Sequence, residues 1–431
     1  MSKRYLFAII DGGGTVPADT SVIRAMVVRG HDVRVLADRV LAPDIERTGA
    51  EHIPWDRAPQ RPNLDPQSVI MKDWDARTPF EAFARVRDGA MTGPAALFAA
   101  DVRAELQRRP ADVVVGNFFV FGAQIAAEAE GVPFAFLVSN LLSFPGSGTP
   151  PLGPGLKPAR GPLGRARDNA INRFMARVFD KGLDDLNGAR RANGLGPIAS
   201  VLQNFERADR LLLMTSRGFE YESFTPPPNV RLVGPRLDDP AWAGEWTPPA
   251  ADDPLVLVGM SSTYMDHAEV LQRAATALGE LPVRGVVTTG PAVDPEEIEA
   301  PANVSVVRRA PHNEVLRHAS AIITHAGHGT VIKALAAGVP VVAIPLGRDQ
   351  LDNAARVQHH GAGLRLKLKA KPEAIAQAVR RVLDEPSFAA SAERLAEAIA
   401  AETARDRAAE ELEALAGHSL NGVAPALERA V

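Results

Sequence analysis

The chain has 431 residues, which is more than one hydrophobic core usually supports, so we expect two domains of roughly 200 residues each. Hydrophobic residues make up 46% of the sequence and charged residues 23%, and a net charge of −4 without any long basic block gives no support to nucleic-acid binding. The sequence contains no cysteine, which excludes disulfides, thiolate metal sites and cysteine nucleophiles.

The first apolar run stops at Asp11, which makes it too short for a secretory signal, and we interpret it as a strand. No stretch approaches the roughly 18 consecutive apolar residues that a membrane span needs. We therefore expect a cytoplasmic protein without a membrane span.

Short apolar runs alternate with helical patterns through the first half of the chain. The expected strands are 5–11, 32–38, 112–117 and 133–140. The expected helices are 19–29, 79–109, 119–130 and 165–193. This alternation predicts a parallel sheet covered by helices on both faces. A segment rich in proline and glycine, 145–164, is expected to be a surface loop beside a binding cleft.

The second half repeats the same rhythm after a proline-rich stretch. Residues 225–254 contain eight prolines, which predicts a linker over 226–254. The expected strands of the second half are 255–262, 283–290, 304–308, 321–324, 340–345 and 363–368, and helices are expected over 386–417. The expected fold class is α/β, with two Rossmann-like domains whose parallel sheets face each other across a cleft. Ligands of such sheets bind beyond the carboxyl ends of the strands.

Residues 324–330 read THAGHGT and lie between a buried strand and a helix. A glycine-bearing turn that opens a helix presents unpaired backbone N–H groups at the positive end of the helix dipole, which favours an anion and above all a phosphate. Gly327 and Gly329 allow close approach, while Thr330 and His325 can donate to the same anion. The alternative is a structural turn in which one histidine caps the strand and the other is solvated.

The segment continues through a strand at 340–345 to Asp349 and Gln350. An acid and an amide at the carboxyl end of that strand would face whatever the phosphate carries. Sugar hydroxyls suit such a pair of acceptor and donor.

The span 309–361 resembles the nucleotide-sugar signature of the family-1 glycosyltransferases. These are GT-B enzymes of the UDP-glycosyltransferase superfamily, and they include bacterial enzymes that glycosylate antibiotics and other natural products. The motifs RAPH, HAGHGT, ALAAGVP and DQ follow one another at the family's spacing. Weaker similarity extends over the chain, in RGHDVRVL (29–36) and VGMSST (258–263).

The resemblance implies an acceptor-binding domain over 1–225, a donor-binding domain over 255–390, and C-terminal helices over 391–431 that pack back towards the first domain. It also implies that His325, Gly329 and Thr330 hold the pyrophosphate with Ser262, and that Asp349 and Gln350 bind the sugar. Arg309, Ala310 and His312 occupy the base-binding stretch. The expected nucleotide-sugar-binding residues are Ser262, Arg309, Ala310, His312, His325, Gly327, His328, Gly329, Thr330, Asp349 and Gln350.

Two positions depart from the donor pattern of the family. Arg309 stands where a stacking tryptophan is common, although a guanidinium can also stack on a base. Lys333 stands where many UDP-dependent members have a glutamate that holds the ribose hydroxyls. Without that acceptor the site depends less on a ribose 2′-hydroxyl, which favours a dTDP-sugar or low selectivity between nucleotides.

The catalytic dyad of the family is absent. Thr15 stands at the position of the histidine base and Asn117 at the position of its aspartate partner. A threonine hydroxyl cannot serve as a general base, and an asparagine cannot stabilise an imidazolium. Asp11 is the first candidate for a replacement base, and its alternative role is a turn residue that accepts hydrogen bonds from the glycine loop.

Two further explanations remain for the missing dyad. The acceptor can be a phenol, an amine or a carbon nucleophile that needs little activation, or the chain can bind a nucleotide sugar without transferring it. The catalytic candidates are Asp11, Thr15 and Asn117.

These observations predict an inverting, metal-independent glycosyltransferase that uses a dTDP- or UDP-sugar as co-substrate, needs no cofactor and glycosylates a small apolar acceptor. A homodimer is left open. The alternative is a non-catalytic nucleotide-sugar-binding protein that assists a glycosyltransferase. A dinucleotide oxidoreductase is disfavoured because GGGTVPA lacks the third glycine and the downstream acid of that fingerprint. Several aromatic residues are weighed as acceptor contacts against core positions: Trp55, Phe118, Phe119, Phe121 and Phe144.

Overall fold

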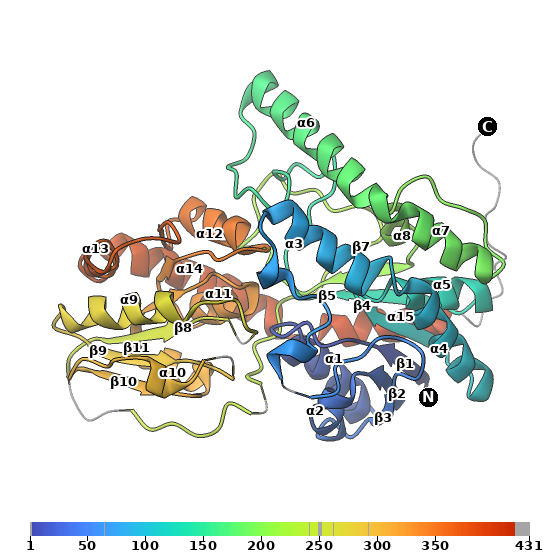
Figure 1. Cartoon of the computed structure of the whole chain (residues 1–431), viewed down its shortest axis with the longest axis horizontal. Coiled ribbons are helices and arrows are strands. Elements are labelled where there is room, and N and C mark those ends of the chain that lie inside the picture. Colours follow the sequence, from blue (N-terminus) through green and yellow to red (C-terminus); the bar gives the residue numbers. More distant parts are fainter. Residues whose placement is uncertain are drawn as a thin grey trace.

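A computed structural model describes residues 2–63, 65–240, 242–248, 252–261, 263–291 and 293–418. They form two α/β domains, one around a seven-stranded sheet and one around a six-stranded sheet (Figure 1). All neighbouring strands in both sheets run parallel. The expected fold class is therefore confirmed.

The N-terminal sheet has the strand order β3-β2-β1-β4-β5-β6-β7. Its central strands are buried throughout because helices cover both faces. The strands are β1 (Arg4–Ala8), β2 (Asp32–Ala37), β3 (Glu51–Pro54), β4 (Val113–Asn117), β5 (Phe134–Val138), β6 (Arg210–Leu213) and β7 (Val230–Leu232). The helices are α1 (Val16–Val28), α2 (Ala42–Glu46), α3 (Pro79–Val86), α4 (Ala95–Arg108), α5 (Phe121–Glu130), α6 (Gly161–Phe179), α7 (Leu183–Ala192) and α8 (Gln203–Glu206).

Two long helices expected in this domain are each divided in the structure. The expected helix 79–109 is divided into α3, a π-helical turn at Arg87–Met91, and α4. Pro94 stands at the N-cap of α4 and, having no N–H, cannot continue a helix from the preceding turn. The expected helix 165–193 is divided into α6 and α7 by a 3₁₀ turn, Asp180–Gly182.

Three short strands were missed. The strands β3, β6 and β7 have four, four and three residues, too few to show a period. β7 lies within the stretch assigned to the linker. It is an edge strand, a position that neighbouring prolines tolerate.

The C-terminal sheet has the order β10-β9-β8-β11-β12-β13, and all six of its strands lie where the sequence predicts strands. They are β8 (Leu255–Gly259), β9 (Arg284–Thr288), β10 (Val304–Val307), β11 (Ala319–Thr324), β12 (Val341–Ala343) and β13 (Gly363–Arg365). The helices are α9 (Ala268–Gly279), α10 (His312–Leu316), α11 (His328–Ala336), α12 (Gln350–His359), α13 (Pro372–Asp384), α14 (Pro386–Thr403) and α15 (Arg407–His418).

The chain returns to its first domain at the end. Ala408, Leu412 and Leu415 of α15 are buried in the same cluster as Tyr5 of β1. The Tyr5 hydroxyl donates a hydrogen bond of 3.3 Å to the Leu412 carbonyl. A helix from beyond the second domain therefore completes the core of the first. None of the helices in the described ranges is both long enough and apolar enough to span a membrane.

Candidate active site

One cavity of about 2140 Å³ lies between the two domains. Its walls come from the turns that follow β1 and β5 in the first domain and β8, β11 and β12 in the second. Carboxyl ends of parallel strands from both sheets thus open onto the same space, which is where ligands of such folds bind.

The turn after β11 is built for close approach. Gly327 is the N-cap residue of α11, and a Cβ added to it would lie 2.5 Å from His325 Nε2. Ala326 takes the left-handed conformation, with φ of 66°, and turns the chain sharply into the helix. The first-turn N–H groups of α11 have no helical partner and face the cavity that Gly327, Gly329 and Thr330 line. The helix start at the THAGHGT motif is therefore present as the sequence predicts.

Both histidines of this turn are neutral. Burial, reinforced by the nearby His267, lowers the pKa of His325 to about 3. Its Nδ1 lies 3.3 Å from Thr324 Oγ1. An uncharged His325 has a single N–H, which already bonds the backbone of Gly259, and it adds no positive charge, so the attraction for an anion comes from the helix terminus.

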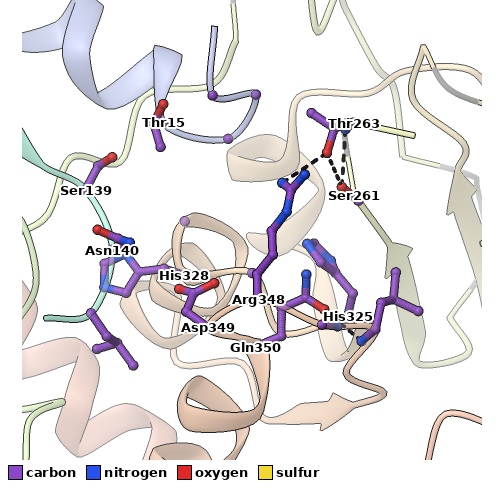
Figure 2. A pocket seen from close by; sticks show the side chains of 18 of the residues that line it. Thr15, Ser139, Asn140, Ser261, Thr263, His325, His328, Arg348, Asp349 and Gln350 are labelled. Carbon is purple, nitrogen blue, oxygen red and sulfur yellow. Dashed lines mark hydrogen bonds between the residues drawn. The ribbon is translucent and has the colours of Figure 1, made fainter. Parts of the chain in front are cut away.

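His328 is at the boundary between the domains. Its Nε2 lies 2.9 Å from the Thr215 hydroxyl of the first domain, and the ring also bonds the backbone of Ser139. Burial lowers its pKa to about 4. Figure 2 shows His328 and Asp349 between Thr15 and Ser139 on one side and His325 on the other. Whatever its part in donor binding, His328 ties α11 to the first domain.

Asp349 and Gln350 follow β12 as predicted, and their two side chains make different contacts. Asp349 is at the N-cap of α12 and accepts a 2.9 Å hydrogen bond from Asn353 Nδ2, and burial raises its pKa. The Gln350 carbonyl accepts from the backbone N–H groups of Leu346 and Gly347, at 2.7 and 2.9 Å. The amide of Gln350 therefore shapes its own loop, while the carboxyl group of Asp349 lies at the cavity (Figure 2).

Arg348 joins the two domains at this loop, and the sequence analysis did not select it. Its guanidinium makes a bidentate ion pair with Asp73 of the first domain, with both N–O distances 2.7 Å. Its Nη1 also donates to Thr263 Oγ1 at 3.4 Å (Figure 2). Arg348 has φ of 54°, a conformation that is uncommon for a residue with a side chain.

The expected base-binding residues also border the cavity. Arg309 donates through Nη1 to the Trp242 carbonyl at 3.1 Å, and Ala310 is buried. His312 Nε2 lies 3.0 Å from Thr288 Oγ1, and burial together with the Lys333 charge lowers the pKa of His312 to about 4. Ser262 lies outside the described residues.

Asp11 is a turn residue in the structure, which is the alternative that the sequence left open. Its Oδ1 accepts from the Gly13 N–H at 2.8 Å and its Oδ2 accepts from Arg61 Nη1 at 2.6 Å. The carboxylate borders the cavity, yet both oxygens already have partners. To take a proton it must use a remaining lone pair or give up one of these bonds.

The two substituted dyad positions meet a third residue that the sequence analysis missed. Asn117 Nδ2 donates to the Ile10 carbonyl at 3.0 Å and to Asp19 Oδ2 at 3.4 Å. Asp19 is fully buried, which raises its pKa to about 8. Thr15 Oγ1, Asp19 Oδ1 and Asn117 Oδ1 are buried without a hydrogen-bond partner among the described residues. An aspartate four positions after a residue at a helix start was the available signal, since both side chains then share one helical face.

Part of the first-domain wall of the cavity is apolar. Phe118 and Phe119 line it, whereas Trp55, Phe121 and Phe144 are buried core residues that do not reach the cavity. The helices α3 and α6 add further apolar side chains that are not fully buried: Phe80, Phe83, Ile171 and Phe174. Phe80 and Phe174 touch edge to face, with ring centroids 5.4 Å apart. This wall suits an apolar ligand.

Comparison with known proteins agrees with this architecture. Residues 273–415 match the model of the erythromycin biosynthesis protein CIII-like C-terminal domain. The chain is 35% identical over 415 residues to 4′-demethylrebeccamycin synthase of Lentzea aerocolonigenes, covering 94% of this chain and 97% of that protein.

Solved structures show the same fold. The calicheamicin glycosyltransferase CalG4 superposes with a TM-score of 0.73 at 22% identity, covering 97% of this chain and 99% of that one. The spinosyn rhamnosyltransferase SpnG complexed with thymidine diphosphate gives a TM-score of 0.66 at 19% identity, covering 95% and 100%.

Two parallel sheets that face each other across a shared cavity, with a glycine turn at a helix start in the second, define the GT-B fold. The chain belongs to the family-1 glycosyltransferases, among the bacterial enzymes that act on natural products.

Proposed function

We propose that this glycosyltransferase moves a sugar from a nucleoside diphosphate, dTDP or UDP, to a small apolar acceptor with inversion at the anomeric carbon. The observation that carries the proposal is that the turn after β11 and the glycine loop after β1 lie close together. A Cβ placed on Gly329 would lie 3.9 Å from the Gly14 carbonyl oxygen, so the donor turn and the glycine loop border one space. A diphosphate on the α11 terminus would present its sugar to an acceptor held by the first domain, and attack from that side in one displacement inverts the carbon.

The leaving group needs no metal in this proposal. The first-turn N–H groups of α11 stabilise negative charge as it develops on the departing diphosphate. A solved structure of the same fold is complexed with thymidine diphosphate, which supports a nucleoside diphosphate as a ligand of this chain. No cofactor is proposed, since the nucleotide sugar is a co-substrate.

Asp11 is the proposed proton acceptor because it lines the cavity, whereas Asp19 does not. Because both oxygens of Asp11 already accept a hydrogen bond, the proposed sugar acceptor is a group that gives up its proton readily, such as a phenol, rather than an alcohol. Thr15 and Asn117 then shape the floor beneath the reacting atoms. The apolar wall of α3 and α6 holds the rest of the acceptor by exclusion of water.

The test is to incubate the purified protein with UDP- and dTDP-sugars and a panel of apolar phenols, amines and alcohols. Released nucleoside diphosphate is measured, and the anomeric configuration of the product is assigned by NMR. Transfer with inversion is expected. A retained configuration would disprove the single displacement.

A second function remains, because the dyad is substituted and Asp11 is engaged by Arg61. It is a partner protein that binds a nucleotide sugar without transferring it. Tight nucleotide binding without release of diphosphate for any acceptor would favour this alternative.

A further inference from the structure

The segment Leu237–Asp239, which follows the last strand of the first sheet, is tied to two helices of the second domain. Asn313 of α10 donates its side-chain amide to the Leu237 carbonyl at 2.6 Å and its backbone N–H to Asp239 Oδ2 at 3.0 Å. Lys333 of α11 donates to Asp239 Oδ1 at 2.7 Å. The Lys333 and Asp239 side chains are only 10% and 16% exposed, so this ion pair is a fixed part of the cavity wall.

The position of this pair follows from the first turn of α11. Lys333 comes three residues after Thr330 and shares its helical face, so Asp239 stands about one turn beyond the anion-binding terminus. The strands β9 and β10 lie on one side of β11, and β12 with Asp349 lies on the other. A sugar must face Asp349 and the first domain to be transferred, so the nucleoside extends the other way, past Lys333 and Asp239 towards Arg309 and Trp242.

We propose that Asp239 is the residue that recognises the ribose, and that it makes the donor site prefer a ribonucleotide over a deoxyribonucleotide. This inference rests on the proposed donor site. Among the described residues, each oxygen of the Asp239 carboxylate has one partner, Lys333 or the Asn313 N–H, and each keeps a lone pair for a hydroxyl donor.

This inference reverses the nucleotide preference that position 333 alone suggests. A lysine there cannot accept a hydrogen bond from a hydroxyl, but it holds a carboxylate of the linker at the same place. A hydrogen bond from a hydroxyl to a charged acceptor is worth more than one to a neutral group, so loss of the 2′-hydroxyl should lower the affinity measurably.

The test compares two ligands that differ in one atom. Calorimetry of the full chain with UDP and with 2′-deoxy-UDP gives two dissociation constants whose ratio reports the 2′-hydroxyl alone. UDP is expected to bind about tenfold more tightly to the wild-type protein. In Asp239→Ala the ratio is expected to fall to within about twofold of unity.

Two further variants separate recognition from structure. Asp238→Ala removes the neighbouring carboxylate, which pairs instead with Arg24 and Ser21 of α1, and it should keep the wild-type ratio. Asp239→Ala with Lys333→Met removes the cation that Asp239→Ala leaves unpaired, and its ratio should match that of Asp239→Ala.

A ratio near unity in the wild-type protein would overturn the inference and leave the donor site standing. An Asp239→Ala variant that binds both ligands more weakly by the same factor, and so keeps the tenfold ratio, would also overturn it, since the residue would then be structural. Binding of neither ligand, nor of dTDP, by the wild-type protein would instead overturn the proposed function itself.

Discussion

The turns after β11 and after β1 both begin at the carboxyl end of a central strand, and they are built in different ways. The turn after β11 depends on its own backbone, with Gly327 beside His325 and a helix start that follows at once. The turn after β1 depends on side chains from elsewhere: Asp11 is held by Arg61, and its N–H donates to Asp38. The first is a local device and the second is assembled by the fold.

The charges of the groups around the two turns differ as well. The histidines at the donor turn are neutral, so charge attraction there comes from the helix terminus. Around the other turn three carboxyl groups gather, those of Asp11, Asp19 and Asp38, and burial raises the pKa of Asp38 to about 7. One turn is suited to hold an anion and the other to hold or accept a proton.

The largest expected effect is on sugar transfer, which we assign to the turn after β1, and not on nucleotide binding, which we assign to the turn after β11. Asp11→Asn should slow sugar transfer to a phenol by about 1000-fold, within the range of a lost general base, while the nucleotide dissociation constant stays within about twofold. Steady-state release of diphosphate and calorimetry measure the two quantities.

Asp44→Asn is the matched control for Asp11→Asn, because Asp44 also lines the cavity but pairs with the exposed Arg47. Unchanged turnover in Asp11→Asn would eliminate Asp11 as the base.

Gly327→Ala should have the next largest effect, and on binding. The added methyl would meet His325 Nε2 at 2.5 Å, and moving that buried ring displaces the first turn of α11. Affinity for UDP and dTDP should fall about 100-fold, equivalent to ~2.7 kcal/mol. Gly14→Ala, across the cavity, meets nothing within 4 Å and should bind nucleotide normally. Equal affinities for all three proteins would show that the turn does not hold the diphosphate.

Arg348→Met tests whether the two turns must be held together. Loss of the bidentate bond to Asp73 should weaken binding of the nucleotide sugar about 30-fold, or ~2 kcal/mol. Asp73→Asn should have a similar effect, and the double variant should be no worse than either single one. Arg4→Met breaks an exposed pair with Asp112 within the first domain and should change nothing. Additive losses would mean that Arg348 acts on the ligand independently of Asp73.

The difference between the turns also explains what the sequence could predict. The β11 turn is contiguous, so its strand, glycines and helix start were predicted from residues 319–337 alone. Arg348 with Asp73, and Asp239 with Lys333, join residues far apart in the chain, and no local pattern marks such pairs. Asp11 shows the same limit, because its role depends on Arg61, which a loop fifty residues later brings beside it.

The smallest effect concerns the buried carboxyl beneath the β1 turn. Burial raises the pKa of Asp19 from its ordinary value of 3.8 to about 8. Below about pH 4 the group is protonated in both the folded and the unfolded chain, and between about pH 4 and 8 only the folded chain keeps the proton. In that range each pH unit lowers the free energy of unfolding by up to about 1.4 kcal/mol through this group.

Asp19→Asn removes this dependence and can keep the hydrogen bond to Asn117, because both side chains then carry donors and acceptors. Denaturant midpoints of the two proteins should therefore diverge as the pH rises from 5 to 7, with the variant gaining relative to wild type. The β11 turn supplies the contrast, since its buried groups are histidines whose pKa values are lowered. The stability that buried neutral histidines contribute is lost as the pH falls. The denaturant midpoint of a His328→Gln variant should therefore diverge from that of wild type only below about pH 6. Parallel pH profiles for wild type and Asp19→Asn would mean that the Asp19 carboxyl is ionised in the folded protein at these pH values, and that burial does not raise its pKa.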